Sequence, residues 1–405
     1  TSVFQTALSH INVLSNSRGT PNMALREAWT NQDFNDLEGQ LIYLKVRGDH
    51  FEIRKAILSE AEAFWEEREP QKPIFLEKDL AYRLVTDIEN ISISDINKVG
   101  GKAANFGELV NVGGIPTPEN AFAIPFYYYE QHMAAFGLNE YVDKMLSDPE
   151  FETNATYRNE QLDILRDSIK DAPINPALVD IVSDKIADFR DFPSFRFRSS
   201  TNAEDLEDFS GAGLYDSKSA KKDHETKTIE TAIKKVWASL WSWRAFEERD
   251  YFKIDHQSCA MGILVHRSFP DEDANGVLVT KNLYNENPGF IINVQYKEES
   301  IVFPEPGTIH DQIMLFTWSV NPGEEFMIEY LSFSNVPELN GERVMTDEEV
   351  LELGRYAKAI KERFYYDLNH NCNCTYTDFG VDIEFKVDSD VSTRKIYVKQ
   401  ARLFK

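Results

Sequence analysis

Phe195-Arg-Phe-Arg-Ser-Ser-Thr-Asn-Ala-Glu-Asp-Leu-Glu-Asp-Phe-Ser-Gly-Ala-Gly-Leu-Tyr-Asp-Ser217 is the most informative stretch of this chain. Its start alternates aromatic and basic side chains, which predicts a short strand with Arg196 and Arg198 on one face. Three hydroxyl residues, an acidic run and the loop Ser-Gly-Ala-Gly (210–213) follow. Arginine offers a fixed fork of donors for phosphate oxygens, and glycines let backbone N–H groups approach an anion. This pattern is typical of a strand and loop that handle phosphate. An arginine strand paired with its own acidic neighbours explains it about equally well.

The composition describes a folded protein with a strongly acidic surface. The 405 residues are 42% hydrophobic and 12% aromatic, which is enough for two or three domains with ample core. The net charge of -25 argues against nucleic acid and anionic membranes as partners, because both attract basic surfaces. An anionic nucleotide would therefore need a local cluster of arginine and lysine, or Mg²⁺.

The remaining features of the composition favour a cytoplasmic location. The three cysteines (259, 372 and 374) give no disulfide framework and suit a reducing compartment. No apolar run approaches the length of a membrane span, and no signal peptide is visible. Because the chain opens on Thr1, we expect it to be processed or cut from a longer parent chain with further domains.

The sharpest acidic pattern lies near the C-terminus. Residues 381–387 alternate strictly, so Asp382 and Glu384 share one strand face, roughly 7 Å apart, a spacing suited to holding Mg²⁺ on a polyphosphate. The following strand puts Gln400 and Arg402 on a common face. Alternating acidic residues are most often a solvated sheet face, and the pattern alone favours that explanation.

Three further stretches carry weaker signals. A glycine pair before Lys102 opens a helix, whose free N–H groups and dipole attract phosphate, although an exposed lysine is the commoner explanation. Residues 228–254 are predicted as one long helix with Arg244 beside its apolar stripe, and most helical arginines are solvated or paired. The apolar stretch 259–266 is predicted to be a core strand.

Together these motifs resemble one family. Arg198-Ser-Ser-Thr-Asn-Ala-Glu-Asp-Leu206 is similar to the arginine–serine–serine motif in the nucleotide-binding domain of pyruvate phosphate dikinase and phosphoenolpyruvate synthase. Ser210-Gly-Ala-Gly-Leu-Tyr-Asp-Ser217 is closer still to glucan, water dikinases, and the closing Asp-Ile-Glu-Phe…Gln-Ala-Arg (382–402) also matches. The family's domain is an ATP-grasp fold. The resemblance therefore implies an α+β fold with an ATP-grasp nucleotide-binding domain.

The resemblance also implies a role for each matched position, with ATP and Mg²⁺ as cofactors. The positions that would contact the nucleotide are Lys102, Arg198, Gly211, Gly213, Arg244, Leu264, Val265 and Glu299. The two that would bind the metal are Asp382 and Glu384. Those that would act on the transferring phosphates are Arg198, Gln400 and Arg402.

The N-terminal segment resembles part of a second domain of the same proteins. Ser9-His10, followed by Arg18-Gly-Thr-Pro21, is similar to the phosphohistidine segment of their swivelling domain, where a histidine carries a phosphoryl group between two active sites. His10 would be the relay residue; a histidine hydrogen-bonded in a turn is the alternative. The expected organisation is a partial α/β phosphohistidine domain (1–57), a linker with one helix (58–90), a first ATP-grasp subdomain (91–254) and a second (255–405).

One stretch departs from the family pattern. Where dikinases usually carry Gly-Leu-Gly-Glu, this chain reads Tyr296-Lys-Glu-Glu299, which keeps the acidic position and loses both glycines. The family reaction sends the β-phosphate of ATP to a histidine and then to an acceptor, such as a glucan or pyruvate. The lost glycines favour a catalytically degenerate nucleotide-sensing module, while the retained closing motif opposes it. An ATP-grasp ligase that forms ADP is the third possibility.

Overall fold

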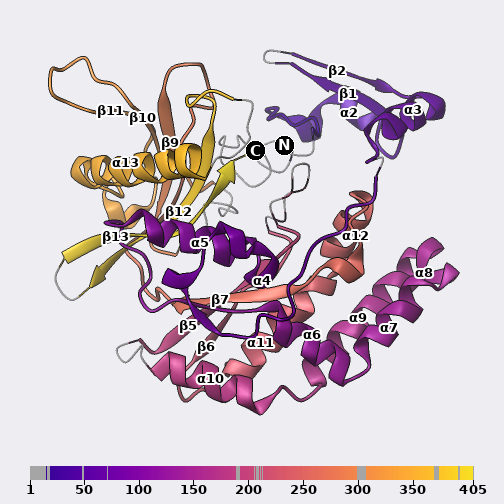
Figure 1. The fold of residues 1–405 in the computed structure, drawn as a ribbon. Coiled ribbons are helices and arrows are strands. Elements are labelled where there is room, and N and C mark those ends of the chain that lie inside the picture. Colours follow the sequence, from indigo (N-terminus) through magenta and orange to yellow (C-terminus); the bar gives the residue numbers. More distant parts are fainter. Residues whose placement is uncertain are drawn as a thin grey trace.

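Three antiparallel sheets form the framework of the chain (Figure 1). The computed structural model describes residues 15, 19–47, 50–70, 72–187, 192–204, 206, 209, 211, 213–298, 307–368, 374–390 and 393–404. Helices and strands mix throughout, as the expected α+β class requires.

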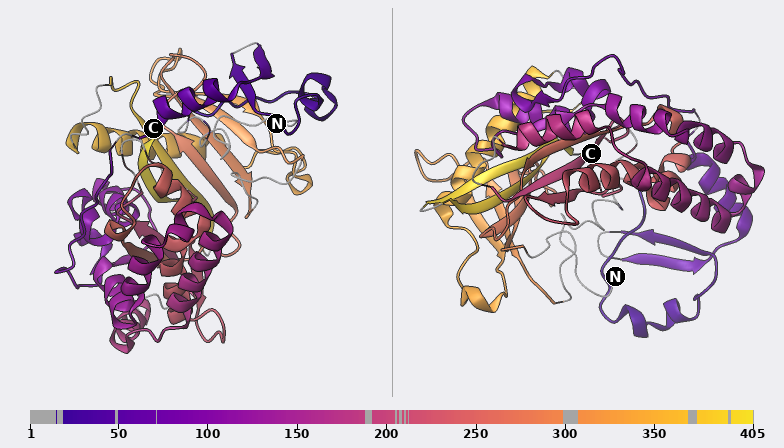
Figure 2. Two further views of the ribbon diagram at one scale, coloured as in Figure 1. Left: turned by 90° about the vertical axis from the view of Figure 1, so that its right-hand side faces the viewer. Right: turned by 90° about the horizontal axis from the view of Figure 1, so that it is seen from below.

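The N-terminal sheet is a hairpin of β1 (Ile42–Val46) and β2 (Phe51–Lys55). It is flanked by α2 (Gln32–Asn35) and α3 (Leu58–Arg68), and α3 is the helix expected within residues 58–90. This unit lies to one side of the other two sheets in Figure 1 and in the right-hand view of Figure 2, and it overlaps the six-stranded sheet in the left-hand view. His10 lies outside the described residues.

The second sheet has five strands in the order β3-β4-β7-β5-β6. Their bounds are β3 Thr86–Asp87, β4 Phe122–Ile124, β5 Ser194–Thr201, β6 Lys218–Lys221 and β7 Met261–Arg267. The helices whose apolar side chains share a core with this sheet are α6 (Phe126–Ala135), α7 (Leu138–Leu146), α8 (Pro149–Thr153), α9 (Ala155–Asp171), α10 (Pro176–Ala187), α11 (Ile229–Ala238) and α12 (Trp243–Tyr251). The rings of Phe195 and Phe197 are buried in that core, which fixes the face from which the intervening arginines project.

The prediction of one unbroken helix over 228–254 is wrong. The helix α11 ends at Ala238, a 3-10 turn spans Ser239–Trp241, and α12 begins at Trp243. The side chain of Ser242 accepts a hydrogen bond from the backbone N–H of Ala245 at 3.3 Å and so caps a new helix. The apolar spacing continues across this break, and for that reason periodicity alone did not reveal it.

The third sheet has six strands in the order β11-β10-β9-β8-β12-β13. Their bounds are β8 Ala274–Val279, β9 Gly289–Tyr296, β10 Asp311–Phe316, β11 Met327–Ser332, β12 Gly380–Asp390 and β13 Thr393–Phe404. The capped helix α13 (Asp347–Glu362) and the helix α5 (Gly101–Val112) share this sheet's apolar core. The short elements are α4 (Ile96–Val99), a π-helix (Arg363–Asp367) and 3-10 turns at Ala28–Thr30, Ile88–Asn90, Ile93–Asp95, His256–Ser258 and Pro337–Leu339.

The chain passes from the second sheet to the third between Arg267 and Ala274. The division expected at residue 254 therefore precedes β7, which is the central strand of the five-stranded sheet. No helix among the described residues is long and apolar enough to cross a membrane. Cys259 is a free, buried thiol, whereas Cys374 is disulfide-bonded.

Candidate functional site

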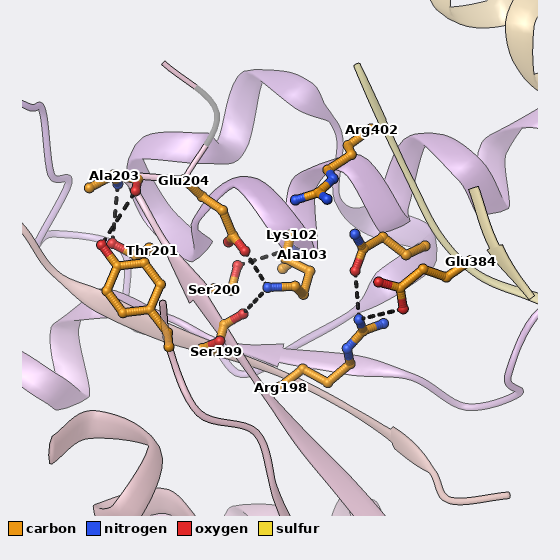
Figure 3. A network of polar contacts seen from close by, with 12 residues as sticks. Lys102, Ala103, Arg198, Ser199, Ser200, Thr201, Ala203, Glu204, Glu384 and Arg402 are labelled. Carbon is orange, nitrogen blue, oxygen red and sulfur yellow. Dashed lines mark hydrogen bonds and ion pairs between the residues drawn. The ribbon is translucent and has the colours of Figure 1, made fainter. Parts of the chain in front are cut away.

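Arg198 joins the two large sheets. It lies on β5, on the face opposite the buried rings of Phe195 and Phe197. Its Nη1 donates to the backbone carbonyl of Lys399 at 2.9 Å. Its Nη2 donates to Gln400 Oε1 at 2.5 Å and to Glu384 Oε2 at 3.2 Å (Figure 3). A guanidinium from one sheet is thus held by the closing hairpin of the other.

That hairpin, β12–β13, presents its charges on one face. Asp382 lies opposite Arg402 and Glu384 lies opposite Gln400 in the ladder. Arg402 donates to Asp382 Oδ2 from Nε at 3.0 Å and from Nη2 at 2.8 Å. The intervening apolar side chains of β12 pack into the core beneath α13. The four polar side chains expected to share a face therefore meet.

A bulge adds Lys399 to this group, which the sequence analysis missed. Glu384 pairs with Gln400 while Phe385 pairs with Val398, so Lys399 is the extra residue of β13. Strict alternation counted back from Arg402 places Lys399 on the core face. The bulge instead brings its Nζ to 3.0 Å from Glu384 Oε2. A lysine between Val398 and Gln400 in a buried strand is the one sequence signal that pointed to it.

Burial and close pairing shift the pKa values of these groups in different directions. Burial alone would raise the pKa of Glu384, but the charges of Lys399, Arg198 and Arg402 hold it well below its ordinary value. Burial raises the pKa of Asp382, and the neighbouring Glu384 adds to this rise against the opposing effect of Arg402. Burial also lowers the pKa of Lys399 to about 8, despite the stabilising charge of Glu384.

The turn before α5 packs directly on β5. Gly100 has φ +86°, and a Cβ there would lie 2.3 Å from the backbone carbonyl atoms of Ser200. The backbone N–H of Ala103 donates to Ser200 Oγ at 2.9 Å, so β5 itself satisfies one donor of the helix N-terminus. Lys102 Nζ donates to the Ser199 carbonyl at 2.9 Å and forms an ion pair with buried Glu204 (Figure 3). The glycine pair therefore allows close packing that places Lys102 beside the arginine strand.

The glycine loop is also engaged within the protein. The N–H of Gly211 donates to the carbonyl of Glu204 at 2.8 Å, and a Cβ at this glycine would lie 3.0 Å from the Ala203 carbonyl oxygen. Gly213 adopts φ +70° and accepts a hydrogen bond from Arg244 Nη2 at 3.3 Å. Arg244 is exposed, so it lies against this loop and outside the buried network around Arg198.

Leu264 and Val265 are both fully buried in the central strand β7, between β4 and β5. Leu264 lies opposite Arg198 in the ladder and packs in the core shared with the six-stranded sheet. Val265 lies opposite Phe197 and packs in the helical core on the other face. The structure thus places only the first of the two side chains on the site's face. His266, expected to be structural, is buried with Nδ1 2.6 Å from the Arg267 carbonyl.

The departure from the family pattern begins at the end of β9. Lys297 adopts φ +54°, and its N–H donates to the carbonyl of Asp273 at 2.9 Å. A lysine therefore holds a left-handed turn of the kind that glycine adopts most easily. Glu299 lies outside the described residues.

Asp382 and Glu384 are too few to bind a metal ion alone, and they suit one that is also bound by a phosphate ligand. Among the described residues, no three His, Cys, Asp or Glu side chains gather into a cluster that could hold an ion. Asp382 and Glu384 are the pair on the site face, and Mg²⁺ is commonly bound by one or two carboxylates with phosphate oxygens and waters. The donor set therefore suits a metal–polyphosphate complex better than a metal alone.

Residues 96–405 match the family described as "Pyruvate phosphate dikinase, AMP/ATP-binding domain". The chain belongs to this family. The expected resemblance is confirmed, and the ATP-grasp fold of the two large sheets follows from membership. The region matched begins at α4 and takes in every residue of the network around Arg198.

Comparison with curated proteins agrees. The chain is 25% identical over 308 residues to a phosphoenolpyruvate synthase of Aeropyrum pernix, covering 75% of this chain and 33% of that protein. It is 24% identical to the phosphoenolpyruvate synthase of Escherichia coli, covering 79% and 41%. It is 31% identical over 204 residues to a rifampicin phosphotransferase of Bacillus cereus, covering 50% and 23%. The chain thus spans less than half the length of these relatives.

Proposed function

We propose that ATP binds between the two large sheets, with its phosphates among Arg198, Lys399, Arg402 and Lys102. The observation that carries this proposal is the contact of Arg198 with both Glu384 and Gln400 across the sheets. Phosphoryl transfer needs mainly charge neutralisation and in-line positioning, which a set of converging cations supplies.

Ligand binding on this face is an exchange of partners. Lys399, Arg198 and Arg402 are each neutralised by Glu384 or Asp382. In the proposed complex, phosphate oxygens accept hydrogen bonds from the cations, and the released carboxylates of Asp382 and Glu384 would hold Mg²⁺, whose charge would help to neutralise the phosphates. Leu264 contributes to the apolar wall for adenine; Val265 is confined to the other core. The loop glycines and Arg244 form the rim.

We propose a dikinase reaction for the protein to which this domain belongs. A nitrogen of His10 attacks the β-phosphorus, the bond from that phosphorus to the α-bridging oxygen breaks, and AMP leaves. Water then cleaves the γ-phosphoryl group as phosphate, so the β-phosphoryl group stays on His10 for transfer to an acceptor. In this proposal residues 1–57 are the latter part of a phosphohistidine domain, and the protein is cytoplasmic.

The acceptor is bound outside residues 96–405 in this proposal. The relatives that share this domain are named for different acceptor chemistry, phosphoenolpyruvate synthase and rifampicin phosphotransferase. Their shared part is therefore the nucleotide domain, and specificity belongs to other regions. A glucan or another small molecule is the proposed acceptor class.

The test uses ATP labelled at either the β or the γ phosphate, with Mg²⁺. Acid-labile label retained from the β position, with AMP formed, is the expected result, and His10→Ala should abolish retention. His50→Ala, an exposed histidine of the same N-terminal unit, is the matched control and should retain label.

Three other outcomes separate the alternatives. Formation of ADP in place of AMP would indicate the ligase. Tight ATP binding with neither product would indicate the degenerate module, which the loss of glycines at 296–299 favours. Retained label in His10→Ala would place the relay elsewhere.

A further inference from the structure

A cavity lies at one end of the six-stranded sheet. Its volume is about 690 Å³, within the size range of small-molecule sites. Its walls are the loop 281–288 between β8 and β9, one side of α13, and the segment 375–378 before β12. The rings of Phe290, Phe326 and Tyr376 line it, together with lysine and asparagine side chains.

This cavity is separate from the proposed nucleotide face. Side chains of β12 alternate, so Val381 and Ile383 pack in the core with Ile360 of α13, while Asp382 and Glu384 project from the opposite face. The cavity is lined by Lys358 and Lys361 of α13, so it lies on the α13 side of that strand. None of the residues of the Arg198 network lines it.

Lys361 of α13 is a buried cation at the wall of this cavity. It is 3% exposed, and its Nζ donates to the Thr280 carbonyl at 2.7 Å. The same Nζ lies 4.7 Å from the centre of the Tyr376 ring and 5.9 Å from that of Phe290. An ammonium group has three N–H donors, and no carboxylate among the described residues forms an ion pair with this one.

The charges around Lys361 leave its ammonium group poorly compensated. Burial, together with the positive charge of Lys281, lowers the pKa of Lys361 to about 8. Asp378 opposes this shift, but its carboxylate accepts a hydrogen bond from the Thr375 hydroxyl at 2.6 Å. Buried charges are ordinarily paired, because an unpaired one is costly.

Lys358, one turn earlier on α13, shows the usual arrangement. It is more exposed than Lys361 and forms an ion pair with Glu325 at the same cavity. Of the remaining acidic side chains lining the cavity, Glu286 is exposed on the loop 281–288. Lys281 and Lys361 form no ion pair with a carboxylate in the part of the chain that the structure describes, and both line this cavity.

We propose that this cavity binds a small organic anion, whose carboxylate or phosphate group pairs with Lys361 and Lys281 while its apolar part contacts Tyr376 and Phe290. The proposal is independent of the nucleotide site. The anion would supply the acceptor oxygens that the ammonium of Lys361 lacks. Carboxylate and phosphate groups both present negatively charged oxygens to the lysines, and the experiment tests the two groups separately.

The test is calorimetric titration of the full chain with benzoate, phenyl phosphate and the neutral benzyl alcohol. We expect one or both anions to bind and the alcohol not to bind. Because an anion stabilises the protonated amine, binding at pH 8.5 should take up protons, measured from buffers of different ionisation heat. Lys361→Met should weaken binding by at least about tenfold, or about 1.4 kcal/mol.

Matched variants make the result decisive. Lys358→Met should change affinity by no more than about twofold, because its charge is already paired near the surface. Arg402→Gln alters the nucleotide face and should leave this binding intact. Lys281→Met, at a half-buried position, tests the same prediction if Lys361→Met does not fold. Absence of binding by both anions, or equal binding in the Lys361 and Lys281 variants, would overturn the proposal.

Discussion

The two large sheets contribute to the site by different physical means. The five-stranded sheet offers Arg198, and steric fit places Lys102 of α5 beside it, since the turn at Gly100 touches the backbone of β5. The six-stranded sheet offers Asp382, Glu384 and Lys399 from a bulged hairpin held by charge pairing. The first half is fixed before a ligand arrives, whereas the second can exchange partners when phosphate enters. Steric packing therefore fixes where the cationic side chains lie, and the carboxylates of the hairpin β12–β13 neutralise their charge.

Arg198 is the residue at which the two halves meet, so replacing it should have the largest effect. Arg198→Ala removes the cross-sheet donor and leaves Glu384 with one fewer cation. We expect ATP turnover to fall by about 10²- to 10³-fold, as for loss of one preorganised donor. Breaking this buried pair should also lower the free energy of unfolding by about 3 kcal/mol.

Arg198→Lys is the control, because it keeps the charge and loses the fork that reaches both Gln400 and Lys399. Partial recovery of stability with little recovery of turnover is expected. Labelled-ATP turnover and chemical denaturation measure the two effects. Full activity in Arg198→Ala would show that the sheets do not meet at a catalytic contact.

A substitution at Gly100 disrupts the close packing against β5 without removing any charged group of the site. A Cβ there would meet Ser200 backbone atoms at 2.3 Å, and φ is +86°. Gly100→Ala should lower the free energy of unfolding by about 3 kcal/mol from strain and overpacking combined. Gly113 has φ +76° and similar ψ, but nothing lies within 4 Å of its Cβ position.

Gly113→Ala should therefore show the strain alone, about 1 to 2 kcal/mol. Urea denaturation of both variants separates the two contributions. Equal losses would mean that the close approach to β5 adds nothing and that the turn is not fixed by packing.

Lys399 allows the charge pairing of the hairpin β12–β13 to be tested through its pH dependence. Burial lowers its pKa to about 8, so the cation is present below pH 8 and lost above it. Nucleotide affinity should therefore fall by up to about tenfold per pH unit as pH rises above 8. Lys399→Met should bind ATP more weakly at pH 7 and should lose this pH step, measured by calorimetry from pH 7 to 10.

Stability should move the other way in the same pH range. The folded pKa lies below the ordinary 10.5, so between pH 8 and 10.5 the unfolded chain binds more protons at this residue. The free energy of unfolding contributed by Lys399 therefore rises with pH in that range. An affinity loss that parallels a stability loss would indicate general unfolding in place of titration at the site.

The sequence predicted the residues that alternate and missed those that depend on irregular backbone. Strict two-residue periodicity sufficed to place Asp382 and Glu384 on one face, and the register places Gln400 and Arg402 opposite them. Lys399 was missed because one bulged residue reverses the side-chain alternation. The break at Ser242 was missed because the apolar spacing continues through it. The glycine pair before Lys102 was expected to leave backbone N–H groups free for phosphate, but the structure shows that Gly100 lies against the backbone of Ser200.

The smallest effect is expected at Arg244, at the edge of the steric half. It is exposed and makes one 3.3 Å hydrogen bond to the Gly213 carbonyl, although the family resemblance assigns it to the nucleotide. From the contacts of the structure, Arg244→Gln should weaken ATP binding by no more than about threefold, the usual range for an exposed interaction. Arg166→Gln, at a half-buried helical arginine paired with Asp163, is the control for loss of a charge. A loss of tenfold or more in Arg244→Gln alone would mean that the glycine loop closes over the nucleotide and carries Arg244 with it, so that the five-stranded half also rearranges on binding.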